Sequence, residues 1–198
     1  MIGQELRPGL WRWTAAHPAW HRDEDWPHDV GCVYVETASA TVLVDPLVPA
    51  GREERFWAAL DRDVELRARP VVVLLTAAWH RRSADTVADR YGAGIWRRGE
   101  TLPDGIDAEL FAAGDWEENV FVVRAHAALV LGDLLEGDGA GGLRMPPKWW
   151  PADEPRTEEV RRELLRLLSR QIELVLVSHG DPVLADGNAA LERALGVS

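Results

Sequence analysis

The stretch Val71-Val-Val-Leu-Leu-Thr-Ala-Ala-Trp-His-Arg-Arg-Ser83 places an apolar run of strand length directly before a polar loop. Five consecutive apolar residues, from Val71 to Leu75, predict a strand that is covered on both faces. Ser83 is a suitable N-cap for a helix that ends at Gly92, and glycine is favoured just past the end of a helix. A buried strand followed by a helix is typical of a layered α/β fold.

Strand signals recur on both sides of this stretch. Upstream, the short β-branched segments Cys32–Glu36 and Thr41–Asp45 predict a hairpin. Downstream, 120–123 and 128–131 predict a second hairpin, and the apolar run 172–177 predicts another buried strand. The chain therefore supplies both hairpins, which make antiparallel sheet, and buried strands, which need helices over their outer faces.

Helix signals lie between these strands. The segment from Glu53 to Arg62 begins a helix with one apolar face, Thr157 is suited to cap a second helix, and Asn188 to start a short final one. The resulting element order predicts an α/β chain with two mixed sheets packed together and helices outside each, a four-layer αβ/βα sandwich. A mixed three-layer α/β fold is the alternative. The stretches 16–29 and 136–155 are predicted to be loops.

Length and composition limit the classes of protein that fit. A chain of 198 residues is predicted to form one domain over 1–198. Its net charge of −11 disfavours nucleic acid as a partner. The sequence has no apolar run of the roughly 20 residues that a membrane-spanning helix needs, and no signal peptide. With a single cysteine, Cys32, this predicts a cytoplasmic protein. The oligomeric state is not indicated.

The tryptophans are unusually numerous. The sequence contains ten, and Trp11, Trp13, Trp20 and Trp26 crowd the segment 1–30, which also holds three histidines. Large rigid rings of this kind either cover a core or line a pocket. The segment is therefore predicted either to pack on the core or to form a lid over a cleft.

Polar residues with metal-binding chemistry follow several predicted strands. Asp45 ends one strand, Asp133 and His179 follow two others, and His80 lies in the loop after Val71–Leu75. In layered α/β folds, ligands collect outside the carboxyl ends of strands. Carboxylate and imidazole groups are also common ligands of divalent transition metals. These four residues are expected to converge at one end of the fold, beside a cleft for a small-molecule ligand.

At this point the chain resembles the metallo-β-lactamase superfamily. The resemblance rests on Val42-Leu-Val-Asp-Pro46, Val73-Leu-Leu-Thr76 with its loop, Leu131-Gly-Asp133 and Val177-Ser-His-Gly-Asp-Pro182. The order of these motifs matches the family's order over roughly residues 30 to 185. The resemblance implies the αβ/βα sandwich, zinc or another divalent metal, and a metal-dependent hydrolase. Among the superfamily's substrates are lactams, thioesters and phosphodiesters, and no motif here selects one.

The departures from the family pattern are equally informative. The family's His-x-His-x-Asp-His signature would fall, in this chain, on Ala77, Trp79, Arg81 and Arg82, none of which is a metal ligand. The family's next histidine has no clear match, and the nearest stretch is 113–116. The resemblance therefore leaves Asp133 and His179 as ligands and Asp45 as a supporting residue. A catalytic zinc needs about three protein ligands, so a metal would require His80 as the third.

Three functions remain open at this stage. The first is a metal-dependent hydrolase with ligands His80, Asp133 and His179. The second is a non-catalytic binding or scaffold protein, in which Arg81 or Arg82 pairs with Asp133 in place of the metal charge and the cleft takes a small anionic ligand. The third is a metal-free enzyme that uses His80 or His179 as a general base.

Overall fold

A computed structural model describes residues 3–24, 26–113, 116–146 and 154–197. The chain divides into two compact units, the first made of residues 1–24 and 28–106 and the second of residues 25–27 and 107–198. Each unit is described by itself below, and the single domain over 1–198 stays a prediction. No helix in the described part of the chain combines the length and the apolar character that crossing a membrane requires.

A six-stranded mixed sheet forms the first unit, in the order β1-β2-β3-β4-β5-β6. Its first four strands are antiparallel neighbours, and β4, β5 and β6 run parallel. The predicted hairpin is confirmed, because Tyr34 pairs with Leu43 and Glu36 with Thr41. The predicted buried strand is β5. The strands are β1 (Gln4–Arg7), β2 (Leu10–Ala16), β3 (Asp29–Glu36), β4 (Thr41–Val44), β5 (Val71–Leu74) and β6 (Gly94–Ile95).

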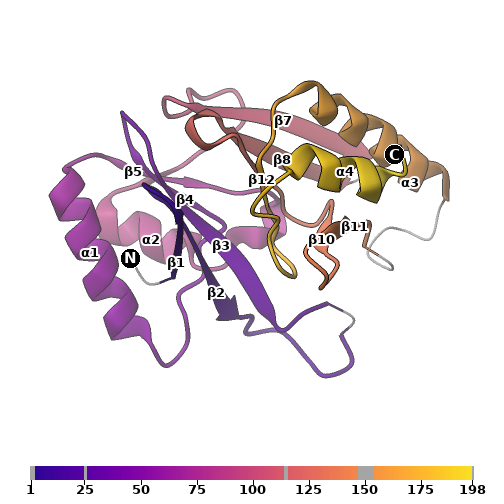
Figure 1. Ribbon diagram of the computed structural model, residues 1–198. Coiled ribbons are helices and arrows are strands. Elements are labelled where there is room, and N and C mark those ends of the chain that lie inside the picture. The colour runs from indigo at the N-terminus through magenta and orange to yellow at the C-terminus, as the bar shows by residue number, and fades with distance from the viewer. Residues whose placement is uncertain (1–2, 25, 114–115, 147–153, 198) are drawn as a thin grey trace. The chain divides into compact units, whose positions relative to one another are not determined.

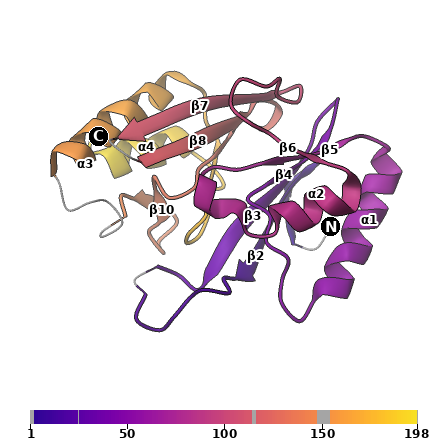
Figure 2. The same ribbon diagram turned by 180° about the vertical axis from the view of Figure 1, so that it is seen from behind.

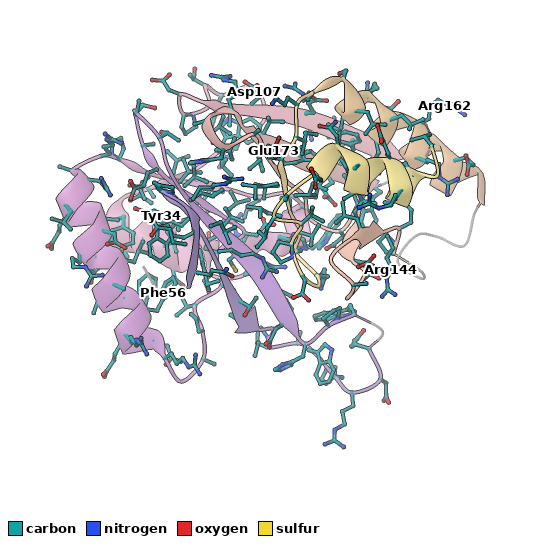
Figure 3. All side chains as sticks on the ribbon, viewed as in Figure 1. Tyr34, Phe56, Asp107, Arg144, Arg162 and Glu173 are labelled. Carbon is teal, nitrogen blue, oxygen red and sulfur yellow. The ribbon has the colours of Figure 1, made fainter. Side chains whose placement is uncertain are left out.

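Two helices, α1 (Glu53–Arg67) and α2 (Ala84–Tyr91), lie beside each other in this unit (Figures 1 and 2). Helix α1 buries Phe56, whose ring centre lies 5.5 Å from that of Trp13 on β2. Trp13 also donates its indole N–H to the carbonyl of Leu47 at 2.9 Å. Figure 3 shows Phe56 and Tyr34 next to α1, in the core of the unit. Trp13 therefore belongs to this core, which is one of the two roles expected for the early tryptophans.

Ser83 precedes α2 as expected, but its hydroxyl does not cap the helix. The side chain makes no capping hydrogen bond, and its oxygen accepts the N–H of Val48 at 3.0 Å instead. The helix ends at Gly92 in the left-handed region, as the sequence predicts. Ser83 therefore holds the chain after Asp45 rather than the first turn of α2.

The second unit contains a four-stranded mixed sheet in the order β12-β9-β8-β7. Strands β8 and β9 form the predicted second hairpin, and β12 pairs parallel with β9. A short hairpin of β10 and β11 lies inside the stretch that was predicted to be a loop. The strands are β7 (Ile106–Ala113), β8 (Trp116–Val123), β9 (Ala128–Val130), β10 (Glu136–Gly137), β11 (Leu143–Arg144) and β12 (Leu174–Leu176).

Helices α3 (Glu154–Leu165) and α4 (Gly187–Leu195) pack on this sheet (Figure 1). Val160 and Leu164 of α3 and Leu191 of α4 share one apolar core with strands β7, β8, β9 and β12. Thr157 lies in the fourth position of α3, so the helix begins three residues before the predicted cap. Short 3₁₀ turns complete the elements: η1 (Ala78–Arg81), η2 (Arg124–His126) and η3 (Arg166–Ser169).

Each unit is thus a mixed sheet with two helices packed on it, and the expected α/β class with two mixed sheets flanked by helices is confirmed. Short hairpins build the antiparallel parts, and the parallel pairs follow helical crossovers, α1 between β4 and β5 and α3 between β9 and β12. The polar residues predicted for the site follow β4, β5, β9 and β12.

Candidate metal site

Asp45 is the centre of a buried polar group in the first unit. It directly follows β4, is 3% exposed, and adopts a left-handed backbone conformation with φ of 47°. Its carboxylate accepts the backbone N–H of Thr76 at 2.9 Å and the hydroxyl of the same residue. Because β4 and β5 are parallel neighbours, this carboxylate ties together the loops that follow both strands.

His80 joins the same group. It lies on η1, is 4% exposed, and its Nδ1 is 3.0 Å from Asp45 Oδ2 and 2.8 Å from the hydroxyl oxygen of Thr76. A carboxylate only accepts hydrogen bonds, and the Thr76 hydroxyl donates to Asp45, so Nδ1 carries a proton, and in the neutral form of the ring it is the only nitrogen that does. The lone pair then resides on Nε2. A carboxylate that orients a histidine through one ring nitrogen is the usual support for a metal ligand.

The two arginines after His80 are held within the first unit. Arg81 forms a two-point interaction with Asp85, through Nε at 2.6 Å and Nη2 at 2.5 Å, and its side chain is 59% exposed. The predicted pairing of Arg81 with Asp133 is therefore wrong, because the guanidinium binds a neighbouring carboxylate one helical turn away. Arg82 donates to the carbonyls of Gly31 and Asp45, both at 3.3 Å. It thus contacts the backbone of Asp45, and its predicted pairing with Asp133 stays a prediction.

The other positions that align with the family signature differ in burial. Ala77 is buried at 2% exposure, whereas Trp79 is 48% exposed. The nearest match to the family's later histidine, 113–116, includes Gly114 and Asp115, which lie outside the described residues. That position therefore stays a prediction.

The second unit holds the other predicted pair. Asp133 follows β9 and His179 follows β12, and because these strands are parallel neighbours, their carboxyl ends meet at one edge of the sheet. His179 Nε2 lies 3.2 Å from Asp133 Oδ1, with both side chains less than a tenth exposed. The expectation that these two residues meet is confirmed. That they share one site with Asp45 and His80 stays a prediction.

Glu118 on β8 was not predicted, although it supports Asp133 directly. Its side chain is fully buried, and its carboxylate accepts the backbone N–H of Gly132 at 2.6 Å and that of Asp133 at 2.9 Å. The signal was present in the sequence. Glu118 shares a strand face with Val120 and Val122, both of which belong to the apolar core, so it is a carboxylate at a core position.

The loop that carries His179 is held by close backbone contact. Gly137 of β10 donates its N–H to the carbonyl of His179 at 3.0 Å. A Cβ atom built on Gly137 would lie 2.3 Å from the carbonyl oxygen of Asp181, so only glycine fits without a shift. On its other side, the ring of His179 meets that of Trp26 edge to face, with centres 5.3 Å apart. One tryptophan of segment 1–30 thus contacts a predicted ligand.

The donor set suits a divalent transition metal. Zinc bonds of 2.0–2.1 Å in tetrahedral geometry place two donor atoms about 3.3 Å apart. The 3.2 Å between His179 Nε2 and Asp133 Oδ1 matches that spacing. In the first unit, His80 is a buried imidazole whose ring is oriented by Asp45. Two imidazoles and one carboxylate are a recurrent ligand set of catalytic zinc.

Comparisons with known proteins test the fold. No family model and no curated protein matches the sequence. Solved structures do match over nearly the whole chain. A metallo-β-lactamase from Hirschia baltica is 13% identical, with a TM-score of 0.66 over 98% of this chain and 95% of its own. The structure of VMB-1 is 11% identical, with a TM-score of 0.66 over 98% and 94%.

A metallo-β-lactamase from Erythrobacter litoralis gives the same result, at 16% identity and a TM-score of 0.60 over 98% of this chain and 90% of that one. The likeness at such low identity is one of backbone arrangement. It agrees with the motif order in the sequence and with the two mixed sheets and their helices. The chain therefore has the metallo-β-lactamase fold.

Proposed function

We propose that this protein is a hydrolase-like protein that binds one divalent transition metal, zinc or a chemically similar ion, through His80, Asp133 and His179. Asp45 acts as the residue that orients His80. Asp133 and His179, which lie next to each other, supply two of the proposed ligands, and His80 supplies the third. Its substrate is a small molecule, and the fold alone selects none of the substrate classes of metallo-hydrolases.

One observation carries the proposal. His179 Nε2 and Asp133 Oδ1, two buried donor atoms from different strands, lie at the separation of two ligands of a single tetrahedral ion. The orientation of His80 supports it independently, because a proton on Nδ1 leaves Nε2 as the nitrogen that would bind a metal. When bound, such an ion lowers the pKa of a coordinated water towards neutrality, which supplies a nucleophile for hydrolysis.

In this proposal the protein's own residues position the two histidine ligands and keep water away from them. Asp45 fixes the ring of His80, and the backbone contact of Gly137 fixes the loop of His179. The ring of Trp26 lies edge to face with that of His179. In this proposal Trp26 is the part of segment 1–30 that acts as a lid, so that a ligand would meet an indole beside the metal.

Metal content is the first test. Protein purified without chelator, or stripped and reloaded with zinc, is expected to hold close to one ion per chain by elemental analysis. Asp133→Asn and His179→Gln are each expected to abolish stoichiometric binding. His126→Gln is the matched control, because His126 precedes β9 whereas Asp133 follows it, so the two lie at opposite ends of that strand. The control is expected to keep the metal.

His80 needs its own variant, because it comes from a different unit. His80→Gln is expected to lower zinc affinity strongly, since two protein ligands hold such an ion weakly. Full retention of zinc by this variant would remove His80 from the ligand set. If the unmodified protein binds no zinc, the spacing of Asp133 and His179 is that of a simple ion pair, and the proposal fails.

The alternative is a non-catalytic binding protein of the same fold with a small anionic ligand. Its support from the sequence was the pair of arginines after His80. Arg81 binds Asp85 on the surface, which removes one of the two cations on which that reading depended. A chain that binds no metal, yet is stabilised by a small anion in a thermal shift assay, would favour this alternative.

A further inference from the structure

We propose that Glu118 is a positioning residue that sets the carboxylate of Asp133 for metal binding. The inference rests on the proposed function, because it assigns to Glu118 a task toward one of the proposed ligands. Glu118 belongs to β8, an element that contributes none of those ligands.

Glu118 binds the loop after β9 at two adjacent backbone positions. One carboxylate oxygen accepts the N–H of Gly132 at 2.6 Å, and the other accepts the N–H of Asp133 at 2.9 Å. Both bonds run to the backbone on which the Asp133 side chain is carried. Strand β8 pairs with β9 through Phe121 and Val130. Glu118 and the loop that it binds therefore belong to neighbouring strands of one sheet.

Burial of the Glu118 carboxylate costs free energy of folding. Glu118 is 0% exposed, on the strand face that supplies Val120 and Val122 to the apolar core. A carboxylate at such a position loses its hydration, which hydrogen bonds within the protein must replace. An apolar residue there would extend the core, while the two N–H groups would lose their acceptor. The buried charge thus fixes backbone direction at the residue where a ligand must point correctly.

The charge also acts on the donors. Hydrogen bonds from backbone N–H groups to an ionised carboxylate are shorter and stronger than bonds between neutral groups. Two of them on adjacent residues restrict the rotation of the peptide group between Gly132 and Asp133. The direction of the Asp133 Cα–Cβ bond follows from that restriction. Residues that orient a metal ligand in this way typically change metal affinity tenfold to a hundredfold when they are replaced.

The experiment compares Glu118→Gln with Glu117→Gln. Both changes remove one negative charge from β8, but the side chain of Glu117 is exposed whereas that of Glu118 is buried. Glutamine at 118 keeps the size of the side chain yet presents an NH₂ group to one of the two N–H donors. Co²⁺ is the probe, because its visible d–d absorption reports coordination geometry as well as binding. Affinity is measured by titration of metal-free protein.

We expect Glu118→Gln to bind Co²⁺ about tenfold to a hundredfold more weakly, with an altered d–d spectrum at saturation. Glu117→Gln is expected to match the unmodified protein in both. Glu118→Asp keeps the charge but is one methylene shorter, and it is expected to weaken binding as well. Thermal melts of each metal-free protein show whether the variant is folded.

Three outcomes overturn the inference. If Glu118→Gln is less stable but binds Co²⁺ with unchanged affinity and spectrum, Glu118 is only a structural brace. If neither Glu118 variant gives a folded protein, its role lies in folding. If the unmodified protein binds no Co²⁺, the proposed function falls and the inference falls with it, whereas normal binding with an unaffected variant overturns the inference alone.

Discussion

Two buried polar groups, one in each unit, use a carboxylate in different ways. In the first unit, Asp45 follows a strand and bonds directly to the imidazole of His80 and to Thr76. In the second, Glu118 lies within a strand and accepts hydrogen bonds from the backbone N–H groups of Gly132 and Asp133. The first carboxylate orients a candidate ligand by touching its ring. The second orients one by holding its main chain, while the Asp133 side chain lies against His179.

The difference also shows in the backbone. Asp45 has φ of 47° and Arg82 has φ of 36°, so the first group includes one non-glycine residue with positive φ and is followed by another. Such residues are uncommon and persist where the surroundings enforce them. In the second unit the close turn after His179 is made by Gly180, with φ of 78°. Glycine adopts this conformation without strain.

The largest effect is expected from removing the carboxylate of the first group. Asp45→Ala removes the acceptor of the buried Thr76 N–H and one of the two oxygens near His80 Nδ1, and we expect a loss of about 2–4 kcal/mol in the free energy of unfolding. Asp45→Asn, which keeps one acceptor and tolerates positive φ, should lose less. Urea denaturation measures both. Asp85→Ala is the control, since that carboxylate is exposed. Equal losses for Asp45→Ala and Asp85→Ala would show that the first group does not hold the fold.

The second prediction concerns how stability depends on pH through Cys32, a buried thiol whose pKa is influenced by Asp45 of the first group. Burial raises the pKa of the Cys32 thiol from 9.0 to about 11, and the Asp45 carboxylate adds to this rise. The unfolded thiol therefore ionises first, and the native thiol keeps its proton. The free energy of unfolding should be independent of this group below pH 9 and fall by about 2–3 kcal/mol as the pH rises to 11.

Cys32→Ala isolates that effect. The raised pKa values of Tyr34 and Tyr91 act in the same direction, but they are common to both proteins. Subtracting the stability of the variant from that of the unmodified protein at each pH leaves the contribution of the thiol. Urea curves at pH 8 and pH 11 that shift equally in both proteins would mean that Cys32 ionises normally in the native state.

The third prediction concerns the close backbone contact between Gly137 and the loop after His179. Gly137→Ala would place a methyl group 2.3 Å from the Asp181 carbonyl oxygen and 2.5 Å from its nitrogen, so the loop after His179 must move. We expect a loss of about 1–3 kcal/mol in the free energy of unfolding. Gly94→Ala is the control, because no atom lies within 4 Å of the added Cβ. Similar unfolding free energies for the two variants would show that the loop yields without cost.

The same contrast explains what the sequence reveals. Hairpins, buried strands and helices follow from local apolar patterns, so 32–36 with 41–45 and 71–75 were predictable. Asp45, Asp133 and His179 could be named as candidate site residues from the sequence because each follows a strand. Glu118 was overlooked because its role depends on the backbone of another strand. The pairing of Arg81 with Asp85 was also missed, although it is local. Asp85 lies four residues after Arg81, and a carboxylate at that spacing competes with any distant partner.

The smallest effects concern the two arginines, and they separate a supporting residue from a surface one. Arg81→Met removes an exposed pair with Asp85, and exposed pairs contribute little because water and salt screen them. Its urea midpoint should hardly change. Arg82→Met removes two bonds to the carbonyls of Gly31 and Asp45, so a loss of about 1 kcal/mol is expected. Raising the salt concentration should shrink the already small effect of Arg81→Met and leave that of Arg82→Met. An Arg81→Met variant as unstable as Asp45→Ala would mean that Arg81 compensates a buried carboxylate after all.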